Sequence, residues 1–245
     1  MPELTIFVCT YNSAATLEEC LVSIVASEPG ANLVVIDHAS SDGTVEIAKR
    51  FGAEIRQESV GLGYARQLCF EISETTYLAF VDGDEEIVEK AFFRKAMRTL
   101  RNPEVGAVAG LGLGHRFTYG LPMGVLVLRS GDFRGKVIPP YVNAREEIFV
   151  RRRLNALGLA TVFLADAKVH RSQYRRYKAE WEGANTRLAA GVSPPQLLFI
   201  LKVMLLQSLN GKRLGNVLYV PIFYLRFLRG FVDPAPWRVL KQVNS

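Results

Sequence analysis

Apolar runs of strand length alternate with segments of helical periodicity over the first half of the chain. The pattern predicts four strands, at Leu4–Cys9, Leu33–Ile36, Ala53–Arg56 and Tyr77–Val81. Between them, apolar residues recur at helical spacing in Ala14–Ala26, Val45–Phe51 and Tyr64–Ser73. This alternation predicts an α/β fold, with a mostly parallel sheet that is flanked by helices on both faces.

The second half continues the α/β pattern and then changes character. The pattern predicts helices over 88–101 and 146–157, and strands over 105–111, 125–128 and 159–164. Ser193-Pro194-Pro195 then marks a boundary, followed by two long apolar segments at 197–209 and 214–232. We therefore expect an α/β domain over residues 1–192 and a C-terminal helical appendage over residues 193–245.

Composition adds a charge asymmetry to this picture. The 245 residues are 49% hydrophobic and 22% charged, which is typical of a globular chain and excludes a disordered one. Residues 1–165 carry 17 Lys and Arg against 20 Asp and Glu, whereas residues 166–245 carry 13 against 4. A tail that is both basic and apolar favours an anionic membrane surface as partner. No nucleic-acid-binding motif accompanies the charge, so we expect no nucleic-acid partner.

The two apolar C-terminal segments differ from ordinary membrane spans. The first is shorter than the ~20 residues that cross a bilayer, and the second is interrupted by Asn216, Pro221, Arg226 and Arg229. We expect both to lie in the membrane interface, with spanning as the less favoured alternative. No Lys or Arg precedes Lys49, and the three cysteines do not form a disulfide framework. These features predict a cytoplasmic protein, peripheral on the cytoplasmic face of the membrane.

Two carboxylates one residue apart follow a buried strand, in Asp82-Gly83-Asp84. Such a pair can converge on one hard cation, Mg²⁺ or Mn²⁺, that keeps open positions for phosphate oxygens. The alternative is a solvated acidic turn, extended by Glu85 and Glu86. The position after Tyr77–Val81 favours the functional interpretation, because ligands of open α/β sheets bind at the carboxyl ends of strands.

Asp37 ends the second predicted strand and can accept hydrogen bonds from a base or a ribose. The residues that follow it, Ser40-Ser41-Asp42-Gly43-Thr44, are typical of a turn and a helix cap. Ser41 and Asp42 therefore have a purely structural interpretation as capping residues.

Five motifs in a fixed order give the chain a family resemblance. The motifs are Thr10-Tyr11-Asn12, VVID-x-x-S-x-DGT, Gly61-x-Gly63-x-Ala65-Arg66, the D-x-D after Tyr77–Val81, and Glu146-Glu147 followed by Arg153-Leu154. Over roughly residues 4–170 the chain resembles glycosyltransferase family 2, whose members have the Rossmann-like GT-A fold and use nucleotide-activated sugars. The resemblance implies an inverting, metal-dependent transferase that acts on a nucleoside-diphosphate sugar.

The resemblance also implies roles for individual residues. The implied nucleotide-binding residues are Thr10, Tyr11, Asn12, Asp37, Arg66, Asp82 and Gly83. The implied metal ligands are Asp84, Asp82 and His170, with Mg²⁺ or Mn²⁺ as the ion. Glu147 matches the family's catalytic base, with Glu146 as its substitute. His170 has an alternative interpretation as a surface residue of a basic segment.

Two departures limit what the resemblance implies. The family usually has Asp where Glu147 stands, and the Q-x-x-R-W sequence of processive synthases is absent. The donor nucleotide, UDP or GDP, and the acceptor, a glycan or a lipid-linked group, stay open. An acceptor hydroxyl needs a base, whereas a lipid phosphate does not. A sugar-1-phosphate nucleotidyltransferase is disfavoured because Thr5–Ala14 contains no glycine. The remaining alternative is a catalytically inactive GT-A module that acts as a membrane-bound partner protein.

Overall fold

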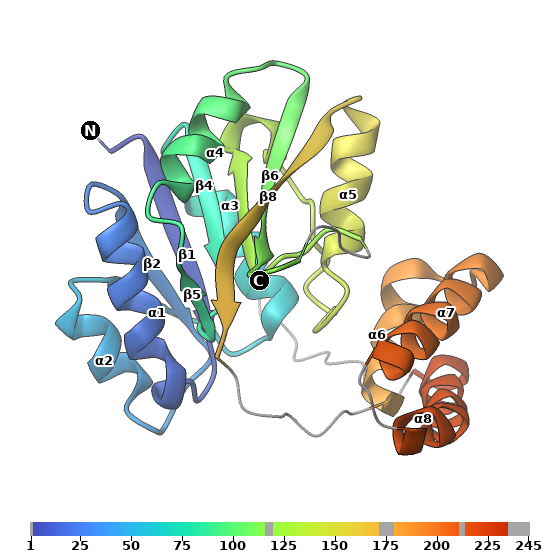
Figure 1. The fold of residues 1–245 in the computed structure, drawn as a ribbon. Coiled ribbons are helices and arrows are strands. Elements are labelled where there is room, and N and C mark those ends of the chain that lie inside the picture. Colours follow the sequence, from blue (N-terminus) through green and yellow to red (C-terminus); the bar gives the residue numbers. More distant parts are fainter. Residues whose placement is uncertain (1, 116–119, 172–178, 211–213, 235–245) are drawn as a thin grey trace.

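The computed structural model describes residues 2–115, 120–171, 179–210 and 214–234 (Figure 1). An eight-stranded mixed sheet forms the centre, in the order β3-β2-β1-β4-β7-β6-β8-β5. The strands are β1 (Leu4–Thr10), β2 (Asn32–Asp37), β3 (Glu54–Gln57), β4 (Tyr77–Val81), β5 (Glu85–Ile87), β6 (Val105–Gly112), β7 (Val125–Arg129) and β8 (Ala160–His170). The first four strands pair in parallel, β7 runs antiparallel between β4 and β6, and β6 pairs in parallel with β8.

Helices cover both faces of this sheet, as the strand–helix alternation predicts. The helices of the α/β domain are α1 (Ala14–Ser27), α2 (Thr44–Arg50), α3 (Leu62–Ile72), α4 (Phe92–Leu100) and α5 (Glu147–Ala156). Alternate residues of one strand serve opposite cores: Ile6 packs with α1, α2 and α4, whereas Phe7 packs with α3 and α5. Because successive side chains of a strand point to opposite faces, a continuous apolar strand sequence is what a doubly covered sheet requires.

Two parts of the sheet differ from the predicted elements. The last strand was predicted over 159–164, but β8 continues to His170 and pairs antiparallel with β5. β5 was not predicted, because its sequence Glu85-Glu86-Ile87 is short and acidic and lacks the apolar alternation of a strand. The pairing of these two segments depends on tertiary contacts, which override local propensity.

The C-terminal helices pack against one another as a three-helix unit, composed of α6 (Ala179–Ala190), α7 (Pro194–Asn210) and α8 (Leu214–Val232), beside the α/β domain (Figure 1). A small core of Ala179, Ile200, Phe227 and Phe231 joins them. The predicted helices at 197–209 and 214–232 are confirmed as α7 and α8, whereas α6 was not predicted. None of the described helices has the length and apolarity that a membrane-spanning segment requires.

Two glycines allow α6 and α8 to approach closely. A Cβ added at Gly183 would overlap the backbone carbonyl of Phe227, and one added at Gly230 would overlap the carbonyl of Glu180. The contact is therefore made by backbone on both sides, and neither side can move as a flexible side chain could. α6 lies before the predicted boundary at residue 193, and it is held by α8, which lies after it.

We expect Gly183→Ala to separate α8 from α6, lowering the unfolding free energy of the three-helix unit by about 1–3 kcal/mol. Hydrogen exchange measures this, because amides of α6 and α8 should exchange faster while those of β1 and β4 stay protected. Gly131→Ala is the matched control, because a Cβ there meets no atom within 4 Å. Unchanged exchange in α6 and α8 would contradict the packing described here.

Candidate functional site

The carboxyl ends of β1 and β2 meet at a hydrogen-bonded carboxylate. The Thr10 hydroxyl donates to Asp37 Oδ1 over 2.9 Å, and the Ser40 hydroxyl donates to the same oxygen over 2.6 Å. The Ser40 amide donates to Asp37 Oδ2 over 2.9 Å. Asp37 is fully buried, so its carboxylate is first of all the anchor of the loop after β2. Its predicted contact with a base stays a prediction.

Asn12 and Asp42 fix the loops on either side of this carboxylate. Asn12 adopts a left-handed backbone conformation (φ 47°), which Asn tolerates better than most residues, and its Oδ1 accepts a hydrogen bond from the Ser41 amide. Asp42 accepts hydrogen bonds from the amides of Ala14 and Thr44, at the starts of α1 and α2. The capping interpretation of Asp42 is therefore confirmed. The amides of Asn12 and Ser13 in turn donate hydrogen bonds to the hydroxyls of Ser40 and Thr44.

Two residues that the sequence analysis missed lie beside Tyr11. The Tyr11 ring packs edge-on against His38, with 5.3 Å between ring centroids. His38 Nδ1 lies 2.6 Å from Glu58 Oε1. The other oxygen of Glu58 accepts hydrogen bonds from the amides of Val60 and Gly61. Glu58 lies in a polar loop, so its sequence context gave no signal of this contact. The result is an exposed aromatic ring above a fixed imidazole, at the end of β1.

Arg66 carries a buried charge at the centre of the site. Its side chain is 1% exposed, its guanidinium lies 4.5 Å above the Phe80 ring, and it forms an ion pair with Asp82. Nε and Nη1 of Arg66 have no hydrogen-bond partner among the residues that the structure describes. Buried donors without partners are costly, so this guanidinium has unused capacity for an anion. Only Oδ1 of Asp82 makes this pair, and the predicted contact of Asp82 with the metal stays a prediction.

Asp84, Glu85 and His170 form a group whose geometry fits a hard divalent cation. The antiparallel pairing of β5 and β8 places Glu85 opposite His170. His170 Nδ1 lies 3.7 Å from Asp84 Oδ1 and 3.4 Å from Glu85 Oε1, and one ligand atom of each residue falls within 4.8 Å of the others. Two carboxylates and an imidazole suit Mn²⁺ or Mg²⁺. The structure thus brings His170 to Asp84, and adds Glu85.

Gly83 has a structural part in this arrangement. Its carbonyl accepts the Thr16 hydroxyl over 2.8 Å, which ties the turn between β4 and β5 to the first turn of α1. A Cβ at Gly83 would make only ordinary contacts of 3.7 Å, so no close approach requires glycine there. Its predicted nucleotide contact stays a prediction.

The two candidate bases lie at the start of α5. Glu146 is buried and precedes the helix, while Glu147 is its first residue. Burial raises the pKa of the Glu147 carboxyl from 4.5 to about 7, and the neighbouring Glu146 adds to the shift. A carboxyl with a pKa near neutrality is suited to accept a proton at physiological pH.

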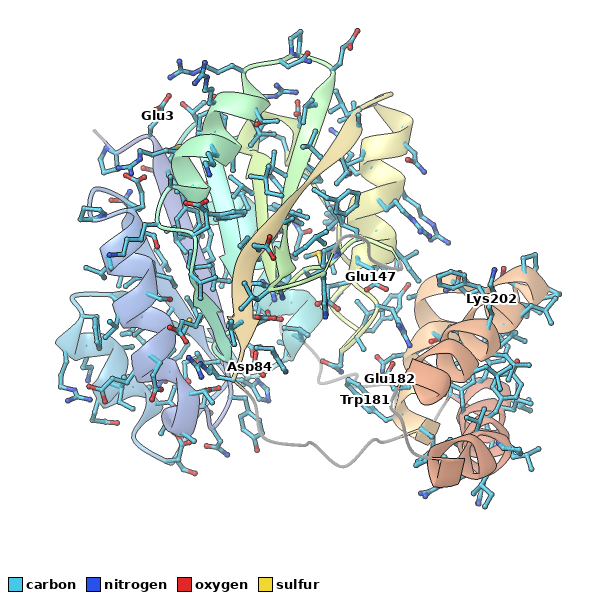
Figure 2. The ribbon with its side chains drawn as sticks, in the orientation of Figure 1. Glu3, Asp84, Glu147, Trp181, Glu182 and Lys202 are labelled. Atoms are coloured by element: carbon cyan, nitrogen blue, oxygen red, sulfur yellow. The ribbon has the colours of Figure 1, made fainter. Side chains whose placement is uncertain are left out.

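The loop before α5 is held from two sides. The Gly63 amide donates to the Val142 carbonyl over 2.9 Å, and a Cβ at Gly63 would overlap that carbonyl. Gly63, the second glycine of the Gly61-x-Gly63-x-Ala65-Arg66 motif, therefore allows close packing against the loop. On the other side, Arg145 forms a 2.8 Å ion pair with Glu182, and the Asn143 amide donates to Asn185 Oδ1. Figure 2 shows Glu147 at the foot of α5, facing Glu182 of α6.

Comparison with known proteins agrees with this geometry. Residues 5–122 match the sequence profile of Glycosyl transferase family 2. This stretch of the chain is thus similar to family 2 glycosyltransferases. Two curated relatives are glycosyltransferase AglE of Haloferax volcanii and glycosyltransferase GlyA of Streptococcus pneumoniae. The first is 28% identical over 129 residues, covering 49% of this chain and 41% of AglE, and the second is 24% identical over 169 residues, covering 66% and 24%. The chain thus spans less than half the length of these relatives.

Solved structures show the fold. The mannosyltransferase PcManGT of Pyrobaculum calidifontis, in complex with GDP-Man and Mn²⁺, aligns with a TM-score of 0.69 at 17% identity, covering 95% of this chain and 87% of PcManGT. The glucosyl-3-phosphoglycerate synthase of Mycobacterium tuberculosis, in complex with Mn²⁺, UDP and glucosyl-3-phosphoglycerate, aligns with a TM-score of 0.59 at 18% identity, covering 78% and 80%. The predicted GT-A fold is confirmed.

The raised pKa of the Glu147 carboxyl predicts a pH-dependent stability of the fold. The unfolded chain releases the proton near pH 4.5 and the folded chain near pH 7, so stability falls as pH rises between these values and the loss is complete above pH 7. Between pH 5 and pH 8 we expect the unfolding free energy of Glu147→Gln to fall by about 1–3 kcal/mol less than that of the wild type. Urea unfolding at the two pH values measures this difference. Glu3→Gln, on an exposed residue distant from the site (Figure 2), is the control. Parallel pH dependence in wild type and Glu147→Gln would contradict the prediction.

Proposed function

We propose that this chain transfers a sugar from a nucleoside-diphosphate sugar to an acceptor, with inversion at the anomeric carbon. The observation that carries the proposal is a set of three groups, of which two follow β4 and the third is linked to Arg66 through the neighbouring Glu146. These are the buried Arg66–Asp82 pair, the cation-binding group around Asp84, and the Glu147 carboxyl with its raised pKa. A donor diphosphate, a metal and an acceptor require these three kinds of group.

On the donor side, Arg66 supports binding of an anionic diphosphate, because two of its nitrogens have unused N–H groups. Asp84 and His170 would hold Mg²⁺ or Mn²⁺, which when bound neutralises charge on the departing nucleoside diphosphate. Tyr11, with its ring exposed above His38, would cover the nucleotide, and the loops at Thr10 and Asn12 would line its pocket. The two similar structures are complexes with GDP-Man and with UDP, so UDP-linked and GDP-linked donors are the candidates.

On the acceptor side, Glu147 would remove the proton from the attacking hydroxyl in a single displacement. Its position at the first turn of α5 faces α6, so the acceptor would approach between the α/β domain and the three-helix unit (Figure 2). Glu146 is less suited to this role, because it is buried behind Glu147 and lies near Arg66. Its negative charge instead balances the guanidinium.

The three-helix unit supports a membrane-proximal acceptor, a lipid-linked group or a cell-surface glycan. Its apolar surface residues include Leu198, Phe199, Ile222 and Leu225, which are 40–67% exposed. Exposed basic residues of the same helices, among them Lys202 and Arg226, would attract anionic headgroups. The chain would then lie on the cytoplasmic face of a membrane, with residues 193–245 as its membrane-associating segment.

A thermal-shift screen tests the transferase proposal. We expect one of UDP, GDP, TDP and CDP to raise the melting temperature in the presence of Mn²⁺ or Mg²⁺ but not of EDTA. Asp84→Ala removes one ligand of the cation and should abolish the metal-dependent part of the shift. Glu18→Ala, on an exposed carboxylate of α1 that pairs with Arg50, is the control and should keep it. No shift with any nucleotide would contradict the proposal and favour the inactive, membrane-bound module.

Sedimentation with vesicles tests the membrane surface. We expect the chain to pellet with vesicles rich in phosphatidylserine, and replacement of Leu198, Ile222 and Leu225 by Asn to weaken binding at least about tenfold, because each side chain loses apolar burial. The matched control replaces Val22, Leu113 and Leu157, equally exposed residues of the α/β domain, by Asn. Equal loss in both triple variants, or no pelleting of the wild type, would contradict a membrane-binding three-helix unit.

A further inference from the structure

A lysine lies inside the acidic group that faces the cation position. Lys168 and His170 are two residues apart on β8, so their side chains share one face of the sheet. Lys168 Nζ forms an ion pair and hydrogen bond with Glu85 Oε1, and the two side chains are 13% and 5% exposed. The ammonium of Lys168 thus pairs with Glu85, one of the two carboxylates in the cation-binding group.

Gly124, which precedes β7, shows how closely these charges gather. A Cβ added there would lie 2.7 Å from Glu85 Oε1, 2.9 Å from Lys168 Nζ and 3.2 Å from Asp82 Oδ2. The three polar groups therefore meet above the Cα of Gly124, where any side chain would displace them. Lys168 lies between the carboxylate that holds Arg66 and the carboxylate that faces His170.

Glu85 has unused capacity for a further cation. The residue is 4% exposed, and its Oε1 lies 3.4 Å from His170 Nδ1. Its Oε2 is buried and has no hydrogen-bond partner among the described residues. Buried carboxylate oxygens normally have partners, so an unpartnered one on a residue whose other oxygen faces His170 points to a ligand of positive charge. The acidic group and this unpartnered oxygen are independent observations.

We propose that Lys168 is a built-in counter-cation that competes with the divalent ion for Glu85. The inference rests on the proposed function, in which Asp84 and His170 hold that ion. Without donor, Lys168 neutralises Glu85, and its ammonium charge repels a second cation, so the ion binds weakly. With donor, the diphosphate adds negative charge, Lys168 leaves Glu85, and Glu85 becomes the third protein ligand. Tight metal binding is thereby coupled to the presence of the donor.

The competing interpretation is a structural ion pair that only orients Glu85. The two interpretations predict opposite effects of removing the ammonium. If Lys168 orients Glu85, Lys168→Met should weaken the metal site, because a positioned ligand is lost. If Lys168 competes, Lys168→Met should strengthen it, because a ligand is released and a repelling charge disappears.

Titration of Mn²⁺ without nucleotide, followed by the EPR signal of the free ion, distinguishes them. We expect Lys168→Met to lower the Kd for Mn²⁺ about tenfold or more, and Lys168→Met/Glu85→Gln to lose this gain. Arg171→Gln is the matched control, because it removes the same charge from the residue that follows His170. Arg171 forms its ion pair with Glu86 and not with Glu85. Its Kd should stay within about threefold of wild type. An unchanged or raised Kd in Lys168→Met, or an equal gain in Arg171→Gln, would overturn the proposal.

Glu85→Gln keeps the inference testable if Lys168→Met fails to fold. We expect Glu85→Gln to change the Kd for Mn²⁺ little without nucleotide, and to raise it about tenfold when the bound UDP or GDP is saturating. Equal effects in both conditions would overturn the competition. If wild type binds no Mn²⁺ even with nucleotide, the proposed function itself fails. If Mn²⁺ binding requires Asp84 and His170 but ignores Lys168 and Glu85, only the present inference fails.

Discussion

The site depends on one buried charge, the guanidinium of Arg66. A charge that is 1% exposed must be compensated, and Asp82 at the end of β4 provides the direct partner, with Glu146 near it and the Phe80 ring beneath it. These contacts fix three segments to one point: the α3 helix, the turn after β4 and the start of α5. This compensation leaves Nε and Nη1 of Arg66 without partners among the described residues, so the guanidinium can still donate hydrogen bonds. A bound anion would supply the missing hydrogen-bond acceptors. This explains why a buried cation, costly by itself, lies at the carboxyl ends of the strands.

The three-helix unit is part of the site through the loop before α5. Arg145 has a left-handed backbone (φ 67°), which is strained for a non-glycine residue, and its side chain is held by Glu182 and Thr186 of α6. The strain is tolerated because α6 fixes the loop from one side and α3 from the other. α6 in turn is fixed to α8 by backbone contacts at Gly183. Any force on α7 and α8 at a membrane surface would therefore reach the loop that positions Glu147.

Much of the α/β core could be predicted from the sequence, because its strands are apolar on both faces and its helices begin at turn residues. Tyr77–Val81 was predicted with its correct bounds, and the strand-end residues Thr10, Asp37 and Asp82 do lie together. What could not be predicted depends on contacts between distant segments. β5 has no strand-like pattern until β8 pairs with it, and the same pairing moves His170 from a surface interpretation to the side of Asp84. His38, Glu58, Glu85 and Lys168 gave no signal, because isolated polar residues acquire a role only from neighbours far away in sequence.

The distribution of charge across the site follows from these contacts. Arg66 compensates Asp82, Lys168 compensates Glu85, and Arg171 compensates Glu86, so three of the carboxylates after β4 already have a resident cation. Among the residues that the structure describes, the side chain of Asp84 has an ion-pair partner only in His170, an exposed imidazole. The acidic turn is therefore close to neutral by itself and would bind a divalent ion weakly. An incoming diphosphate changes that balance, because its own negative charge makes the site net negative again. Metal and donor would then bind together, each stabilising the other, which is the arrangement that a transferase needs if it is to avoid holding a reactive cation without its substrate.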